Sequence, residues 1–414
     1  MKSNQFSNAP YARQTRFPIL TAKHHPRNFM ILKTFIRTLI LAFVSITASA
    51  ALEAAPLREF MILTGWTPTN IDSTLTAQAL KKAGFNTVLW PLDKLESCRA
   101  AGLKLMAEHA RPEDAAKLKS DSAIWGYHLA DEPKAPIFPA LAEQIKNFRE
   151  ADPNHPANIN MLCFAGELLQ HYMRTVKPEV LSYDHYPWWW GSHSHFEKLE
   201  QHRDAALAAG IPLTCWIEAN ANPNVEWGGD QACDPDNAVK LRQSVFTSLA
   251  YGVKGIQWFS GAQIFKPGTT ELNECGQQIA KLNGALQKLG PILLNLRSVD
   301  VFHTKPLPRR THESQHDHWA QVIGEELLWG MFKDADDTDY ILVANRDIHH
   351  RQQATIQFQR AGYGRKVKSV QRLDKTTGAW TPLSSNVKVL FVENLEPGDG
   401  QLFKILKEEE VRTP

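Results

Sequence analysis

Two adjacent acids, Asp131 and Glu132, end the apolar run "AIWGYHLADEP" and are followed at once by Pro133. A charge that enters a packed core is costly unless it is paired or titrates. Pro133 excludes an ordinary helix through this point and favours an extended backbone at Glu132. Asp and Pro are also common turn residues, so a surface turn is the alternative. We favour a strand end that places Glu132 at an opening of the fold, where a residue of another element must pair with it.

The surrounding sequence predicts the elements that position these acids. Short β-rich runs alternate with alanine- and leucine-rich helical segments, and glycines that are typical left-handed helix stops (Gly84, Gly102 and Gly210) precede three of the runs. Repeated strand–helix units predict a closed (β/α)8 TIM barrel of the α/β class over residues 57–292. The competing doubly wound sheet requires a glycine-rich turn after the first run, and the sequence has none there. The eight runs are 59–66, 85–92, 103–109, 123–133, 157–166, 180–188, 211–220 and 252–261.

The pattern of the sequence changes near residue 298. Short alternating strands follow one another with turns such as "KDADDTD" and "EPGDG", and no long helical pattern interrupts them. Such a pattern is typical of an antiparallel β-sandwich, which we predict over residues 298–410.

The first 55 residues form a predicted leader. Residues 30–50 contain two basic residues, an apolar stretch and a small-residue end "ASA", which is the layout of a cleaved signal peptide. The apolar stretch is short for a membrane span, so we expect a secreted or periplasmic protein whose mature chain does not cross a membrane. In an oxidising compartment Cys233 and Cys275, which lie in polar surroundings, could pair, whereas Cys98, Cys163 and Cys215 are typical of buried thiols.

Composition excludes some classes of partner. The net charge of +2 is not that of a nucleic-acid-binding surface. Histidines cluster at 193–195, 312–318 and 349–350, but the first run lacks the His-x-His of metal-dependent barrel hydrolases, and a solvated surface is the better interpretation of the second cluster. We therefore predict neither a metal nor another cofactor.

The predicted strand ends carry acids and flat aromatic side chains. In barrels of this kind the chemistry lies at the carboxyl ends of the strands, where such a combination suits a sugar. Glycoside hydrolysis needs two carboxyl groups that flank the scissile bond. Glu132 and Glu218, at the ends of the fourth and seventh runs, are predicted to face each other across the mouth. The predicted substrate-binding residues are Asp131, Tyr186, Trp258, Trp216, His109, Asp184, Trp188, Trp66 and Trp90.

At these positions the sequence resembles glycoside hydrolase clan A, whose retaining barrels carry the acid/base on strand four and the nucleophile on strand seven. The resemblance extends over the barrel by architecture, and its motifs are "DEP", "YDHYP", "WIEAN" and "IQWFS". It implies that Glu132 is the acid/base, that Glu218 is the nucleophile supported by Tyr186, and that Trp258 lines the sugar subsite. Asp131 replaces the usual asparagine of the clan. It can accept a hydrogen bond from a sugar hydroxyl but cannot donate one.

Two functions therefore remain open. The first is a secreted, retaining glycoside hydrolase that acts on a poly- or oligosaccharide. The alternative is a non-catalytic glycan-binding protein on a degenerate glycosidase barrel, which would keep the aromatic mouth but would need no second acid. Trp66, Trp90 and Tyr186 could also belong to the core.

Overall fold

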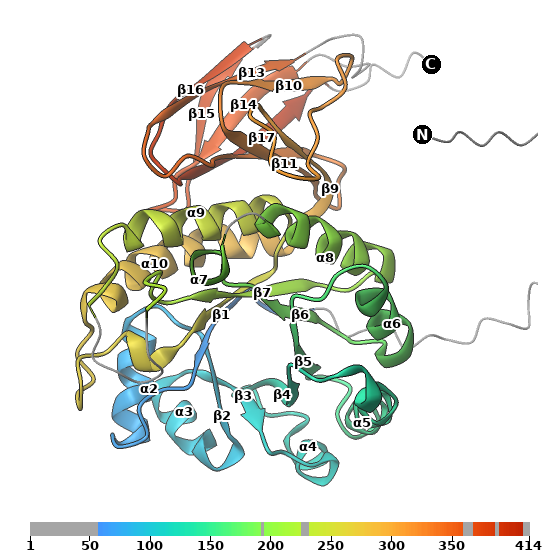
Figure 1. Ribbon diagram of the computed structural model, residues 1–414, viewed down its shortest axis with the longest axis vertical. Coiled ribbons are helices and arrows are strands. Elements are labelled where there is room, and N and C mark those ends of the chain that lie inside the picture. The colour runs from blue at the N-terminus through green and yellow to red at the C-terminus, as the bar shows by residue number, and fades with distance from the viewer. Residues whose placement is uncertain (1–56, 192–193, 225–231, 359–366, 386–388, 409–414) are drawn as a thin grey trace, which may run out of the picture. The chain divides into compact units, whose positions relative to one another are not determined.

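The computed structural model describes residues 57–191, 194–224, 232–358, 367–385 and 389–408. Eight parallel strands close into a barrel in sequence order (Figure 1). This arrangement confirms the predicted TIM barrel. The strands are β1 (Met61–Gly65), β2 (Thr87–Pro91), β3 (Lys104–Glu108), β4 (Ile124–Asp131), β5 (Ala157–Leu162), β6 (Leu181–Asp184), β7 (Leu213–Glu218) and β8 (Gly255–Phe259).

Helices surround the strands, and local sequence sets their ends (Figure 1). Asp72 caps the first of them by accepting hydrogen bonds from the backbone N–H groups of Thr74 and Leu75. Gly102 and Gly210 end two others in the left-handed conformation, each with a φ of 66°, as their positions predict. The helices are α2 (Ser73–Lys82), α3 (Leu95–Ala101), α4 (Pro112–Leu118), α5 (Phe138–Ala151), α6 (Glu167–Val176), α7 (Pro187–Trp190), α8 (His195–Ala209), α9 (Asn237–Ala250) and α10 (Glu274–Leu294).

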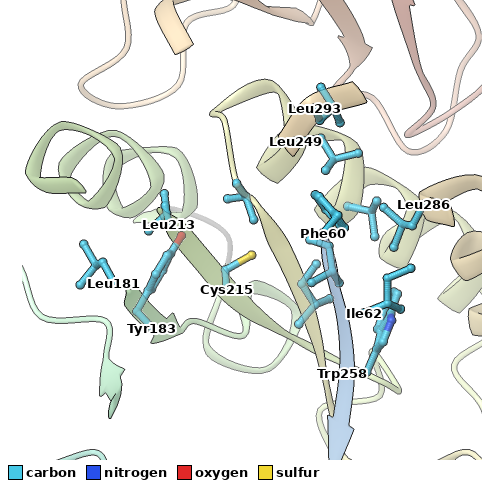
Figure 2. Packing of buried hydrophobic residues seen from close by; sticks show 14 of the residues in the cluster. Phe60, Ile62, Leu181, Tyr183, Leu213, Cys215, Leu249, Trp258, Leu286 and Leu293 are labelled. Carbon is cyan, nitrogen blue, oxygen red and sulfur yellow. The ribbon is translucent and has the colours of Figure 1, made fainter. Parts of the chain in front are cut away.

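The two faces of the barrel strands bury different sets of side chains. Successive side chains of a strand point to opposite faces, so alternate residues enter either the barrel interior or the layer under the helices. Figure 2 shows part of the helix-facing cluster, with Ile62, Tyr183, Cys215 and Trp258 among its members. The interior cluster is separate and contains Met61, Leu63, Leu89, Met106, Trp125, Val180, Tyr186, Trp216 and Phe259.

A second domain of antiparallel strands follows α10. A six-stranded sheet (β15-β14-β17-β12-β11-β9) and a three-stranded sheet (β10-β13-β16) share one apolar cluster, which confirms the predicted β-sandwich. The strands are β9 (Arg297–His303), β10 (Ala320–Ile323), β11 (Leu327–Lys333), β12 (Asp339–Asn345), β13 (Gln352–Phe358), β14 (Val367–Leu373), β15 (Trp380–Ser385), β16 (Val389–Leu395) and β17 (Gly400–Lys407).

The sandwich contacts the barrel through α9. A Cβ added to Gly330 of β11 would lie 2.0 Å from the carbonyl oxygen of Ala250, so this contact leaves no space for a side chain. Beside it, the hydroxyl of Tyr251 lies 2.9 Å from Nε2 of His303. The two domains therefore share a packed and hydrogen-bonded boundary.

The predicted leader and signal peptide lie outside the described residues. Within the part of the chain that the structure describes, no helix is both long and apolar enough to span a membrane.

Candidate active site

Asp131 and Glu132 lie at the carboxyl end of β4, as their sequence context predicts, and both are exposed. The backbone of Glu132 is left-handed, with a φ of 43°, so the predicted extended conformation is wrong. Its N–H donates to the carbonyl of Asn160, at 2.9 Å, and thereby extends the hydrogen bonding between β4 and β5 by one residue. A non-glycine residue in this region carries a cost of roughly 1 kcal/mol or more, and such strain is frequent at functional sites.

Asn160 of β5 joins the acids of two strands. Its Nδ2 donates to Oδ1 of Asp131 at 2.9 Å and lies 3.5 Å from Oδ1 of Asp184, the last residue of β6. Its own Oδ1 accepts a hydrogen bond from Ser182. Asn160 was not predicted from sequence, although the alternation of Asn158 and Asn160 in "ANINML" places both amides on one face of the strand.

The carboxyl group of Asp184 is almost completely buried, with 1% of its surface exposed. Burial raises its pKa to about 8, and the negative charges of Glu132 and Asp131 and a hydrogen bond to the Glu132 carboxyl act in the same direction. Asp184 therefore holds a proton at neutral pH beside Glu132.

Glu218 ends β7 and is completely buried. One of its carboxyl oxygens, Oε1, accepts a hydrogen bond from the backbone N–H of Trp188 at 2.9 Å, and the other, Oε2, has no hydrogen-bond partner among the described residues. Burial raises the pKa of Glu218 to about 8, against the lowering effect of the hydrogen bond from the Trp188 N–H and of the positive charge of Lys240.

In this arrangement the raised pKa favours the protonated form of Glu218, because its carboxyl group is completely buried. Among the described residues its hydrogen-bond donor is the backbone N–H of Trp188, and no hydrogen bond joins it to Tyr186, so the predicted support by Tyr186 is not found in this arrangement.

Aromatic rings line the mouth between these acids. Trp66 is 37% exposed and packs on Trp216 and Phe259, at centroid distances of 5.1 and 5.0 Å. Tyr186 stacks on Phe259 at 5.4 Å and also contacts Trp190, which is 52% exposed. Flat exposed rings of this kind suit the apolar faces of pyranose sugars. Phe259 was missed in the sequence, where the neighbouring Trp258 was chosen.

The position of Trp258 argues against its predicted role in a sugar subsite. It is completely buried in the helix-facing layer (Figure 2). Its Nε1 donates to Oδ1 of Asn283 in α10 at 2.9 Å. The alternation of β8 places Phe259 in the interior instead. Trp90 is likewise 7% exposed in the helix-facing layer, with its Nε1 on the hydroxyl of Thr67, so it belongs to the core. Trp216 is buried beneath Trp66, and its ring packs against the ring of Trp66.

A hollow of about 550 Å³ lies next to Asp131, between the ends of β3 and β4 and helix α5. Its lining includes Glu108, His109, Arg111 and His128. Burial raises the pKa of Glu108 and lowers that of His128 to about 4, so the imidazole of His128 is neutral. The hollow offers carboxylate and imidazole groups to polar atoms of a ligand. His109, a predicted substrate-binding residue, lies in the lining of this hollow.

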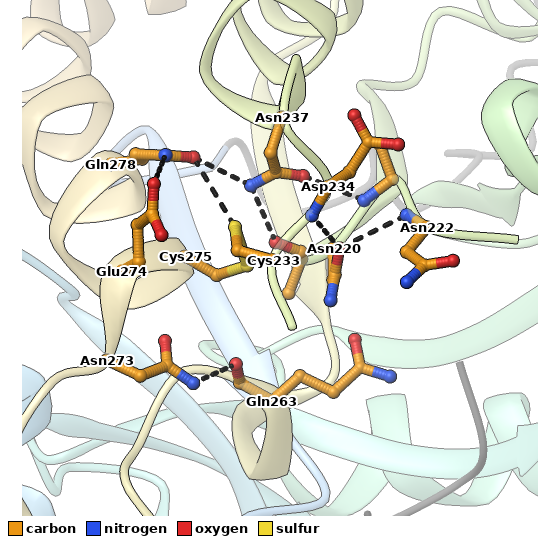
Figure 3. Close-up of a disulfide and its surroundings, with 12 residues drawn as sticks. Asn220, Asn222, Cys233, Asp234, Asn237, Gln263, Asn273, Glu274, Cys275 and Gln278 are labelled. Atoms are coloured by element: carbon orange, nitrogen blue, oxygen red, sulfur yellow. Dashed lines mark hydrogen bonds between the residues drawn. A yellow bond between two sulfur atoms is a disulfide. The ribbon is translucent and has the colours of Figure 1, made fainter. Parts of the chain in front are cut away.

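The chain between β7 and α10 is fixed by a disulfide bond between Cys233 and Cys275 (Figure 3). Next to it Asn220 accepts a hydrogen bond from the N–H of Asp234. Asp234 in turn pairs with Lys240 of α9 at 2.8 Å, and the ammonium of Lys240 lies 5.6 Å from the ring centre of Trp188. The disulfide, which the sequence left open, thus fixes the segment that packs against the cover of Glu218.

The histidine clusters contribute no metal centre within the described residues, where no group of three or more His, Cys, Asp or Glu side chains is placed to hold an ion. His195 is buried and bonds the hydroxyl of Thr247. His193 lies outside the described residues.

No family model matches the sequence. No curated protein matches it either. Among solved structures, the chain is similar to a GH51 arabinofuranosidase from Xanthomonas axonopodis pv. citri, with 10% identity, a TM-score of 0.47, and coverage of 85% of this chain and 97% of that chain. It is also similar to a GH27 β-L-arabinopyranosidase from Geobacillus stearothermophilus, with 10% identity, a TM-score of 0.49, and coverage of 87% and 98%. A family 5 mannosidase from Rhizomucor miehei matches with 11% identity, a TM-score of 0.41, and coverage of 58% and 100%. Likeness at this level assigns no activity to the chain.

Proposed function

We propose that this protein is a glycoside hydrolase that cleaves O-glycosidic bonds of an oligo- or polysaccharide at the mouth of the barrel, without a cofactor. One observation carries the proposal. Glu132 and Glu218 lie at the carboxyl ends of β4 and β7, on the same rim of the barrel, beside the packed rings of Trp66, Phe259 and Tyr186. Two carboxyl groups around one aromatic-walled mouth match the requirement of glycoside hydrolysis.

In the proposed double displacement, Glu132 is the acid/base and Glu218 is the nucleophile. Glu132 is exposed, so it can reach the oxygen of the leaving group and protonate it as the bond from that oxygen to the anomeric carbon breaks. Ionised Glu218 forms the new bond to the anomeric carbon. Water that Glu132 deprotonates then attacks the same carbon and releases Glu218 as a carboxylate.

This role requires the cover of Glu218 to move. In the described arrangement Trp188 bonds Oε1 of Glu218 and the carboxyl has no exposed surface. Entry of a sugar must therefore displace α7, and this brings solvent and substrate to the carboxyl. The loss of burial removes the main cause of its raised pKa and favours the ionised form that attacks.

A screen with aryl glycosides and with plant or algal polysaccharides tests the proposal, and product stereochemistry tests its mechanism. We expect the first-formed sugar to keep the anomeric configuration of the substrate, as observed by proton NMR in the first minutes of reaction. A first-formed sugar with inverted configuration would exclude the double displacement. Binding of a glycan without hydrolysis of any substrate would favour the alternative, a glycan-binding protein.

We also propose that the protein is secreted or periplasmic. The layout of residues 30–50 and the disulfide bond support this, because disulfides persist in oxidising compartments. We expect the mature N-terminus near Ala51, and a peptide pair linked through Cys233 and Cys275 under non-reducing conditions. N-terminal sequencing and peptide mass mapping of the exported protein measure both. Exported protein that still carries residues 30–45 would contradict the proposal.

A further inference from the structure

The hollow beside Asp131 has no role in the proposed double displacement. Its volume of about 550 Å³ lies within the range of roughly 300–1,000 Å³ that is typical of small-molecule sites. The lengths of two neighbouring helices explain why it is open. Because α4 has 7 residues and α5 has 14, α4 can cover only part of the face that α5 turns towards it.

One face of α5 forms a wall of the hollow. Gln144, Asn147 and Phe148 are three and four residues apart, a spacing that places them on the same side of a helix, and all three line the hollow. Phe148 is buried, and its ring packs on Tyr127 at a centroid distance of 5.1 Å. Leu129 of β4 adds further apolar surface. The hollow therefore combines an apolar surface that is fixed by packing with polar side chains.

The polar side chains of the lining have unused hydrogen-bonding capacity. Glu108, at the end of β3, and the amides of Gln144 and Asn147 make no side-chain hydrogen bond within the part of the chain that the structure describes. Each amide has donors and an acceptor, and the carboxyl group accepts. A sugar unit fits such a lining, because its hydroxyl groups both donate and accept while its ring has apolar faces.

The charges around the hollow favour a neutral ligand. Asp131 and Glu108 bring two carboxyl groups to the lining, which would repel an anion. The guanidinium of Arg111 is already paired, since its Nε lies 3.2 Å from Oδ2 of Asp114. Burial raises the pKa of Glu108 and so opposes a full negative charge that would select a cation.

Asp131 connects the hollow with the mouth of the barrel. It lines the hollow, and its Oδ1 accepts the hydrogen bond from Asn160 at 2.9 Å. The next residue in the chain is Glu132, the proposed acid/base. A sugar unit in the hollow can therefore belong to the same glycan whose bond is cleaved at the mouth.

We propose that the hollow is a second sugar-binding site, which holds a neutral sugar unit of the substrate away from the scissile bond. The protein should accordingly act on oligo- and polysaccharides in preference to glycosides of a single sugar. That the ligand is a sugar rests on the proposed function.

The double variant Gln144→Ala/Asn147→Ala tests the site, because it removes two polar groups that bond nothing among the described residues. We expect KM for oligosaccharides of about four to six units to rise about tenfold with kcat unchanged. Kinetics on aryl monoglycosides should stay within about twofold of the parent, since these small substrates do not reach the hollow. Lys146→Ala/Glu150→Ala is the matched control, at exposed positions of the same helix outside the lining. An equal change for both classes of substrate, or no change for either, would overturn the proposal.

A binding measurement separates this proposal from the proposed function. Neutral oligosaccharides of about two to six units are titrated by calorimetry into Glu218→Gln, with galacturonate oligosaccharides as the charged comparison. We expect the neutral series to bind, and to bind about tenfold more weakly when Gln144→Ala/Asn147→Ala is added. The same loss of binding in a chain that hydrolyses no glycoside would support the site and contradict the proposed function alone. Hydrolysis of oligosaccharides that the double variant leaves unchanged would contradict the site alone, and tighter binding of the galacturonate series would overturn the assignment of a neutral ligand.

Discussion

Replacement of Glu218 by alanine should reduce hydrolysis on the order of 10⁴-fold, because no other group can form the bond to the anomeric carbon. The substitution leaves a space at the end of β7, where the carboxyl is enclosed in the parent protein. A small anion such as azide or formate can fill that space and attack in place of the side chain. We therefore expect partial recovery of turnover with added azide on an aryl glycoside, and a glycosyl azide of inverted configuration as the product.

Glu218→Gln is the matched control for this experiment. Glutamine keeps the volume and the acceptor for the N–H of Trp188, so azide should not restore activity. The Glu218→Gln substitution should also remove the contribution of this carboxyl group to the pH dependence of the stability. Burial raises the pKa of Glu218 to about 8, so the folded parent binds a proton more strongly than the unfolded chain and loses stability as the pH rises from about 4 to 8.

The Tm of Glu218→Gln relative to the parent should accordingly be higher at pH 8 than at pH 5. Retention of parent-like activity by Glu218→Ala would remove this residue from the mechanism. Loss of activity without azide rescue, together with loss of the folded state by circular dichroism, would point to a structural role instead.

Replacement of Glu132 by alanine should have the second-largest effect, and the effect should depend on the leaving group. Substrates whose leaving group is a sugar or an alcohol need protonation, so kcat/KM should fall by roughly 10² to 10⁴. Dinitrophenyl glycosides leave without a proton and should retain a kcat/KM within about tenfold of the parent value. The second step also loses its base, so a burst of the phenol should precede slow turnover, and azide should accelerate that turnover.

Asp131→Asn provides the control at the adjacent position. It places the residue usual in the resembling clan beside Glu132, and its side chain remains within reach of Asn160. We expect it to keep most of the activity on both classes of substrate. An equal loss for activated and unactivated leaving groups in Glu132→Ala would contradict the acid/base role, because that role predicts a difference between the two classes.

The barrel, the sandwich and the rim of acids were all predictable from sequence, because each rests on a local property. Period-two runs, helical segments and glycine stops such as Gly102 report the conformation of a few consecutive residues. Once the runs are ordered in a parallel barrel, their carboxyl ends must share one face. The positions of Asp131, Glu132, Asp184 and Glu218 on the rim therefore follow from their places at strand ends.

Side-chain direction within a strand was not predictable, because it depends on register. A shift of one residue exchanges the two faces of a strand, and β8 ends in two adjacent aromatic residues that are equally plausible from sequence. Tertiary packing decided that Phe259 enters the interior and that Trp258 lies under α10.

The chemical state of the acids was decided by contacts between distant segments. The pKa of Glu218 is raised by burial, and that of Asp184 is raised by burial and by the negative charges of Glu132 and Asp131. The sequence by itself determined the fold class, the domain order and which acids lie on the rim, since these follow from local periodicity and strand ends. Only the tertiary structure decided which acids are exposed, which hold a proton and which aromatic rings line the mouth. Desolvation and charge–charge interaction act through space, and no local pattern of residues encodes them.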